Sequence, residues 1–421
     1  MTRIGQMNAE AFLRELFTTT VAAADPNNVL EPHLPANRSR PAWVIGAGKA
    51  AGSMASALEQ AWQGPLRGLV VTRYGHGCPC EHIEVVEAGH PVPDEIGAKT
   101  AQRILDLVSG LSADERVIFL VSGGGSSLLT LPAPTIQMAD KQQINRALLR
   151  SGAAIDEINC VRKHLSAVKG GRLALACEPA TTLTLAISDV PGDDPAVIAS
   201  GPTVADNSTS AEAIAILQRY DIILPTAVEA WLRDPASESI KAGYLDPQRH
   251  QYQLIATPAS CLAAAQCLAE ENGVDVIYLG DDLEGESREL AASQAALARS
   301  RLGRDKPSLI LSGGETTVTL RGNGRGGRNT EFLLSLANEL QGEAGIYALA
   351  ADTDGIDGSE DNAGAILRPD SWQRARALGL DALDMLNNND SYGYFAALDD
   401  LLMTGPTRTN VNDFRAIYIS G

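Results

Sequence analysis

The sequence predicts an α/β protein built from two domains. Its 421 residues exceed the roughly 100 to 200 residues of a typical domain. Short apolar runs alternate with helical patterns along the chain, which is typical of parallel strands joined by helices. A charged, turn-rich stretch at 234–250 interrupts this alternation. We therefore expect a doubly wound domain in residues 1–245, a second α/β domain in residues 246–421 and a cleft between them.

Each element expected in the first half is marked by a local pattern. Residues 8–24 carry apolar side chains at helical spacing, among them Phe12 and Leu16. An apolar run at 42–45 leads into a glycine turn and an alanine-rich helix that ends near Trp62, the unit that opens a doubly wound sheet. The other expected elements are strands at 69–72, 83–86, 117–121 and 183–187 and a helix at 96–108.

The second half repeats the alternation after the turn-rich stretch. Its first expected strand, at 253–256, opens a series that belongs to the second domain. Further strands are expected at 274–279 and 308–311, with helices at 261–271 and 286–301 between them. This domain should therefore have a core of its own.

Composition and charge limit the function. A hydrophobic share of 44% with 20% charged residues is that of an ordinary globular protein. The formal net charge of -18 repels nucleic acid and anionic lipid, so neither is an expected partner. An anionic ligand would then need a local basic pocket. The N-terminal segment has no apolar stretch of signal-peptide length and no run is long enough to span a bilayer, so we expect a cytoplasmic protein without membrane contact.

The six cysteines show no disulfide framework, which fits reduced thiols in the cytosol. Cys78 and Cys80 lie close together between His76 and His82, a set of residue types that can bind zinc. However, Pro79 between the two thiols breaks the usual Cys-x-x-Cys loop. We favour a turn that leads into the strand at 83–86.

A first candidate anion site is the glycine turn at 46–51, with Lys49 at its tip. Such a turn lets the backbone approach a phosphate, and the following helix offers free amide groups. A surface lysine on a tight turn fits the spacing equally well. Residues 64–72 offer no acid at the end of a second strand for the ribose hydroxyls, which weakens a nicotinamide dinucleotide interpretation. The chain also lacks a P-loop and the motifs of protein kinases.

A second candidate site follows the strand at 117–121. Its serine and glycine residues can form a concave nest of amides and hydroxyls for a carboxylate or phosphate: Ser122, Gly123, Gly124, Gly125, Ser126 and Ser127. Further on, residues 159–172 gather five potentially cationic side chains in an acidic protein, including Arg162 and Lys169. A solvated helix face is the alternative, but the concentration of charge favours an anion pocket.

Carboxylates follow two other expected strands. Asp189 ends the strand at 183–187, where it could bind Mg²⁺ or orient a substrate hydroxyl. Asp352 and Asp354 supply hard oxygen ligands suited to Mg²⁺ that carries nucleotide phosphates. Arg328 could neutralise charge on a phosphoryl group during transfer.

Several motifs together resemble the class II glycerate 2-kinases, which carry a MOFRL-type second domain. The likeness runs in the family's order from about Pro41 to the C-terminus. It rests on residues 46–50 (Gly-Ala-Gly-Lys-Ala), 89–94 (Gly-His-Pro-Val-Pro-Asp), 122–127, 188–193 (Ser-Asp-Val-Pro-Gly-Asp), 201–203 (Gly-Pro-Thr), 313–316 (Gly-Gly-Glu-Thr), 327–329 (Gly-Arg-Asn), 352–358 (Asp-Thr-Asp-Gly-Ile-Asp-Gly) and 409–413 (Thr-Asn-Val-Asn-Asp). Arg408 departs from the pattern, because many relatives have a small residue or glycine before the final Thr-Asn.

The resemblance implies conversion of D-glycerate to 2-phosphoglycerate with ATP and Mg²⁺, in a cleft between a Rossmann-like domain and a smaller MOFRL-type domain. It also implies roles for individual residues. Lys49, Arg328 and Asp189 are the expected catalytic residues. The expected substrate and phosphate contacts are the loop 122–127 with Arg162, Lys169, Glu315 and Asn329, and the expected metal ligands are Asp352 and Asp354.

Two other functions remain compatible with the residues. Relatives have been described as hydroxypyruvate reductases, which would make the chain an NAD(P)H-dependent enzyme. A non-catalytic sensor of hydroxy acids would use the same pocket without needing Asp352 or Asp354.

Overall fold

The computed structural model describes residues 8–421, which fall into two compact units. The N-terminal unit is residues 29–255, and the C-terminal unit combines the segment before residue 29 with residues 256–421. The sequence placed the boundary ten residues earlier, between 245 and 246, and assigned the N-terminal helix to the first domain. The structure thus divides the chain differently at both places, and each unit is described by itself below.

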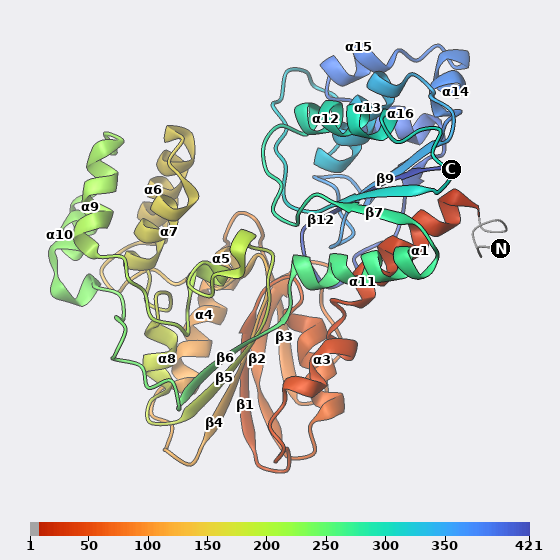
Figure 1. The fold of residues 1–421 in the computed structure, drawn as a ribbon. Coiled ribbons are helices and arrows are strands. Elements are labelled where there is room, and N and C mark those ends of the chain that lie inside the picture. Colours follow the sequence, from red (N-terminus) through yellow and green to blue (C-terminus); the bar gives the residue numbers. More distant parts are fainter. Residues whose placement is uncertain (1–7) are drawn as a thin grey trace. The chain divides into compact units, whose positions relative to one another are not determined.

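The N-terminal unit is built on a six-stranded sheet in the order β3-β2-β1-β4-β5-β6 (Figure 1). The pairs from β3 to β5 are all parallel, as expected for a doubly wound sheet. The strands are β1 (Ala42–Ala47), β2 (Leu66–Arg73), β3 (Ile83–Ala88), β4 (Arg116–Val121), β5 (Thr181–Ile187) and β6 (His250–Ala256). The predicted α/β fold is confirmed.

Both faces of this sheet are covered by helices, because its strands are apolar on both sides (Figure 1). Side chains such as Ile45 and Phe119 pack against helices α4 and α8, in one buried core. Their neighbours along the strands alternate to the face that α3 covers. The helices of this unit are α3 (Ala51–Ala61), α4 (Glu95–Val108), α5 (Gly125–Leu128), α6 (Met138–Ser151), α7 (Ile155–His164), α8 (Arg172–Cys177), α9 (Ser210–Arg219) and α10 (Thr226–Arg233). The short helix α2 (Pro26–Val29) spans the boundary between the two units in the sequence. Short 3-10 turns lie at Glu31–His33, Pro191–Asp193, Ile198–Ser200 and Pro235–Ser237.

Helices α6, α7, α9 and α10 form a separate bundle beside the sheet (Figure 1). Their shared core includes Ile144 and Leu148 of α6, Val161 of α7 and Trp231 of α10. The sequence patterns did not predict this bundle as a distinct layer. It matters for function because α6 and α7 carry charged side chains toward the sheet.

The C-terminal unit contains a second six-stranded sheet, in the order β11-β10-β9-β12-β8-β7. It is mixed: β7 and β8 are parallel, whereas β12 is antiparallel to both β8 and β9. The strands are β7 (Asp275–Tyr278), β8 (Ser308–Ser312), β9 (Ile346–Asp352), β10 (Gly364–Leu367), β11 (Leu401–Leu402) and β12 (Asp413–Ile419). The helices are α1 (Ala9–Ala22), α11 (Pro258–Glu271), α12 (Ser287–Arg299), α13 (Arg328–Leu340), α14 (Ser371–Ala377), α15 (Ala382–Asn387) and α16 (Ser391–Ala397).

Helix α1 belongs to the C-terminal unit because its apolar face packs on the second sheet. Phe12 meets the ring of Tyr418 edge-on with centroids 5.9 Å apart, and Phe17 meets Phe414 at 5.7 Å. The periodicity predicted this helix correctly but could not show which sheet it covers. Among residues 8–421, no helix has both the length and the apolar composition needed to cross a bilayer.

Strand β6 is a correction to the sequence analysis. The run at 253–256 was expected to open the second domain, but it forms the edge of the first sheet beside β5. The turn-rich stretch before it therefore lies within the N-terminal unit, and the chain leaves that unit only after β6. The cysteine-rich segment is a turn into β3, as favoured, and Glu59 accepts the backbone amides of Glu81, His82 and Ile83 there.

Candidate active site

The two glycine loops of the N-terminal unit lie against each other. Lys49 donates its backbone amide to the carbonyl of Gly123 at 2.8 Å, and the amide of Ala50 donates to the Ser122 hydroxyl at 2.9 Å. Gly48 has a φ of 143° and lies so close to Ser122 that an added Cβ would be 2.1 Å from its Oγ. Only glycine permits this conformation and approach. The two candidate anion sites predicted from the sequence therefore lie side by side in the structure.

The serine loop turns sharply from β4 into α5. Gly124 adopts a φ of 78°, and a Cβ on it would lie 2.8 Å from the His90 Nε2 and 3.3 Å from the Cγ of Lys49. The loop thus packs between His90 and the side chain of Lys49. His90 was not among the predicted site residues, although it lies in the motif at 89–94.

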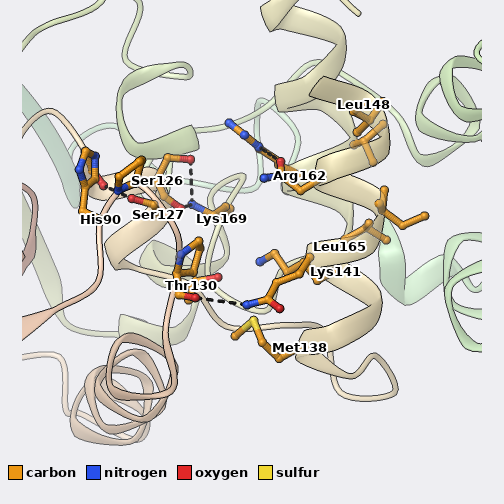
Figure 2. Close-up of a pocket in the computed structure, with 17 residues that line it drawn as sticks. His90, Ser126, Ser127, Thr130, Met138, Lys141, Leu148, Arg162, Leu165 and Lys169 are labelled. Carbon is orange, nitrogen blue, oxygen red and sulfur yellow. Dashed lines mark hydrogen bonds between the residues drawn. The ribbon is translucent and has the colours of Figure 1, made fainter. Parts of the chain in front are cut away.

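A pocket of about 250 Å³ opens beside this loop, lined by side chains of α5, α6 and α7 (Figure 2). Three cations line it, Lys141, Arg162 and Lys169, together with Ser126 and Ser127. No Asp or Glu is among its described lining residues. In a chain with a net charge of -18, such a concentration of positive charge favours an anionic ligand.

Lys169 holds the serine loop in place through hydrogen bonds. Its side chain is 1% exposed, and its Nζ donates to the carbonyl of Ser126 at 2.7 Å and to that of Ala199 at 3.3 Å. The Ser126 hydroxyl also bonds that of Ser200 at 2.7 Å. Burial and the neighbouring cations lower the pKa of Lys169 well below its ordinary value. Lys169 therefore fixes the shape of the loop through these hydrogen bonds.

Arg162 projects into the pocket from α7. Its Nε donates to the Oδ1 of Asn145 on α6 at 2.7 Å, which orients the guanidinium group. Burial lowers the pKa of Arg162. The other cations of this segment serve elsewhere: Lys163 pairs with Asp206 at 2.9 Å, and Arg172 donates to the carbonyl of Ser237 at 2.7 Å. Arg162 and Lys169 of this segment therefore line the pocket, whereas Lys163 and Arg172 have structural partners.

Lys141 is the pocket residue that the sequence analysis missed. It lies on α6 and is 9% exposed, and its Nζ has no hydrogen-bond partner within residues 8–421. Burial, with the nearby Arg162, lowers the pKa of Lys141 to about 7. The sequence could have indicated this position, because Lys141 precedes Ile144 and Leu148 at a spacing that places all three on the apolar face of one helix.

Asp189 follows β5 directly and is half-buried, but it is not among the residues that line this pocket. Its neighbour Ser188 is buried and accepts the amide of Val190 at 3.2 Å, which shapes the turn.

In the C-terminal unit, Arg328 is the centre of a network of carboxylates. It begins α13, and its Nε donates to both oxygens of Asp413 at 2.9 Å. Its other nitrogens donate to Glu315 at 2.9 Å and to Asp352 at 2.8 Å. Burial by itself would lower the pKa of Arg328, but these carboxylates raise it well above its ordinary value. Arg328 is therefore permanently charged and held in one orientation.

Asn329 and the start of α13 are fixed by two buried acids. Asn329 donates its Nδ2 to Asp413 at 2.7 Å, while Asp357 accepts the backbone amides of Asn329 at 3.0 Å and Thr330 at 2.9 Å. Burial raises the pKa of Asp357 despite these hydrogen bonds. Arg415, which is fully buried, donates to Asp413 at 2.8 Å. Asp357 and Asp413 lie within motifs of the family resemblance, but the sequence alone indicated no role for them.

Asp352 ends strand β9, and Asp354 lies in the turn after it. Asp352 accepts Arg328 on Oδ2 and the amide of Asp354 on Oδ1 at 3.0 Å, and Asp354 accepts the amide of Ile356 at 2.9 Å. Within residues 8–421, no group of three or more His, Cys, Asp or Glu side chains is placed to hold a metal. Arg408, the departure from the family pattern, has a φ of 62°, which explains why glycine suits that position.

The N-terminal unit is thus an α/β fold with a cationic pocket beside its glycine loops, and the C-terminal unit is a mixed-sheet fold whose Arg328 is held by three carboxylates. Residues 12–233 match a domain of unknown function, DUF4147, and residues 308–413 match the MOFRL family. A D-glycerate 2-kinase of Thermotoga maritima is 40% identical over 95% of each chain.

Other relatives also match this chain over nearly their whole length. A protein of Agrobacterium vitis named as a hydroxypyruvate reductase is 51% identical over 98% of this chain and 95% of its own. The crystal structure of a glycerate kinase from Thermotoga maritima superposes with a TM-score of 0.87 at 39% identity and covers 97% of this chain and 99% of that chain. The chain belongs to the glycerate 2-kinase family with a MOFRL domain, as the motifs indicated.

Proposed function

We propose that the protein transfers the γ-phosphoryl group of ATP to the C2 hydroxyl of D-glycerate and forms 2-phospho-D-glycerate and ADP. The observation that carries this proposal is the pocket beside the serine loop, which gathers three cations and no described acid. Its ligand should therefore be a small anion. The family membership supplies the phosphoryl-transfer chemistry.

In the proposed reaction the hydroxyl oxygen of D-glycerate attacks the γ-phosphorus, the bond from that phosphorus to the bridging oxygen breaks, and ADP leaves. The hydroxyl proton passes to solvent or to a phosphate oxygen. Phosphoryl transfer depends mainly on positioning and on neutralising charge. We assign the neutralisation to Lys49 and Arg328 and the anion binding to the loop 122–127 with Arg162 and Lys169. Asp189, Glu315 and Asn329 complete the proposed polar contacts.

Magnesium would be held through the nucleotide. The carboxylates after β9 offer few oxygens that are not already engaged, so they fit Mg²⁺ only if phosphate oxygens and water supply most of its ligands, as is usual for this ion. Asp352 and Asp354 are the proposed protein ligands. The ion would supply charge neutralisation on the phosphates.

The reductase named among the relatives is the second candidate. Strand β2, which would hold the ribose of NAD in a dinucleotide fold, is Leu-Arg-Gly-Leu-Val-Val-Thr-Arg and carries no acid. This favours the kinase. We also place the protein in the cytoplasm, because all six cysteines are free thiols.

The test is to incubate the protein with D-glycerate, ATP and Mg²⁺, to follow ADP release and to identify the product by phosphorus NMR. Hydroxypyruvate with NADH or NADPH is assayed in parallel. Substrate-dependent ADP with a 2-phosphoglycerate resonance is the expected result. Nucleotide oxidation without ADP would replace the kinase with a reductase, and D-glycerate binding without either reaction would indicate a sensor.

A further inference from the structure

Lys141 occupies a position that packing alone does not explain. It lies on α6 on the same face as Ile144 and Leu148, where an apolar residue would fit. Its side chain is nine-tenths buried and its Nζ has no hydrogen-bond partner within the described chain. A buried charge without a partner destabilises a fold. The position is therefore explained best by a ligand that supplies the missing partner.

The groups that face Lys141 come from every element around the pocket. Arg162 approaches from α7, while Lys169 and His90 line the pocket from the loops beside the sheet (Figure 2). Asn145 lies on α6 itself. None of the described lining residues is a carboxylate. Burial and Arg162 together lower the pKa of Lys141 to about 7, so part of the free protein carries an uncharged amine there at neutral pH.

We propose that Lys141, together with Arg162, binds the carboxylate of the hydroxy-acid substrate and thereby limits the enzyme to acids. The proposal rests on the proposed function and names the specificity residue of that same site. Arg162 presents a planar guanidinium group, which matches a carboxylate, and its Nε is already oriented by Asn145.

The lining of the pocket favours a small acid. Three cationic side chains and no described carboxylate line a volume of about 250 Å³. Leu148, Val161 and Leu165 are also part of its lining. Apolar side chains beside the cations lower the local dielectric and so strengthen an ion pair with the substrate.

Binding should be linked to protonation. The carboxylate pairs with the ammonium form of Lys141, so it raises the pKa of that amine and draws a proton from solvent. Below pH 7 the amine is already charged and the KM for D-glycerate should not vary with pH. Above pH 7 the KM should rise, approaching about tenfold per pH unit, because free protein must first take up a proton.

The test compares Lys141→Met, Lys141→Gln and Lys141→Arg with wild type and with Lys99→Met, a control on the exposed face of α4. We expect the methionine and glutamine variants to raise the KM for D-glycerate by about 30-fold or more, with the KM for ATP changed less than about twofold. Both should lose the rise of KM above pH 7. The arginine variant should recover part of the affinity without that pH dependence.

Calorimetry separates this proposal from the kinase assignment. D-Glycerate is titrated into wild type and variants in buffers of different ionisation enthalpy, with glycerol as the uncharged analogue. Binding of D-glycerate with proton uptake that is lost in Lys141→Met supports the role of Lys141 even if ADP is never released. A rise in the KM for ATP alone, or equal D-glycerate affinity in wild type and both neutral variants, would overturn it.

Discussion

The cations of the two units are held in opposite ways. In the N-terminal unit, Lys141, Arg162 and Lys169 line one pocket without a described carboxylate. In the C-terminal unit, Arg328 is bound by three carboxylates, those of Asp413, Glu315 and Asp352. In our proposal the pocket cations are neutralised by an anionic ligand, whereas Arg328 is neutralised by carboxylates of the protein. The pocket therefore favours ligand binding, and Arg328 is held in one orientation.

Replacing Arg328 tests the second arrangement with the largest expected effect. Arg328→Met should lower kcat by about a thousandfold, because the transferring phosphoryl group loses a preset positive charge. Steady-state kinetics with D-glycerate and ATP measures it. Arg325→Met, on the exposed loop three residues earlier, is the control and should leave kcat unchanged. A similar loss in both variants would mean that the loop, and not the Arg328 charge, is required.

Removing the acid that anchors Arg328 should cost stability. Asp413→Asn leaves the fully buried Arg415 without its ion-pair partner, so the free energy of unfolding should fall by about 3 kcal/mol. Hydrogen exchange of the α13 amides reports on this loss locally. Asp361→Asn, at an exposed position of the same unit, is the matched control. Unchanged protection of α13 would show that Asp413 is not its anchor.

Lys49 should contribute less than Arg328, whose guanidinium group is held in one orientation by three carboxylates. Lys49→Met should lower kcat by about a hundredfold with a normal thermal melt. Lys306→Met, an exposed substitution, is the comparison. Wild-type turnover in Lys49→Met would remove this residue from the catalytic assignment.

Replacing Lys141 tests the first arrangement. Lys141→Met should stabilise the free protein by up to about 4 kcal/mol at pH 6, since it removes a buried charge without a partner in the described chain. The folded pKa of Lys141 is lowered from 10.5 to about 7, so the unfolded chain binds the proton more tightly between these values. The advantage of the variant should therefore be largest below pH 7 and disappear as the pH approaches 10.5. Urea unfolding at several pH values measures it, and a destabilised variant at pH 6 would contradict the assignment.

Local patterns predicted the elements but not their partners. The apolar runs correctly marked β1, β2, β4, β5 and β8, because burial on both faces of a sheet requires them. The same patterns could not show that β6 pairs with β5 or that α1 covers the second sheet, since both depend on contacts distant in sequence. Among site residues, Lys49 and the serine loop could be expected to meet at one sheet edge. Asp413 could not be assigned a role, because its position beside Arg328 comes from the pairing of β12 with β9.

The packing of α1 on the second sheet has a consequence for synthesis. Phe12 and Phe17 are synthesised about 400 residues before their partners Tyr418 and Phe414. At about 5 to 20 residues per second, this interval is roughly 20 to 80 s. Residues 29–255 are made within that interval, while the apolar face of α1 has to wait until β12 is synthesised. A nascent chain stalled after β6 should therefore expose this helix to chaperones.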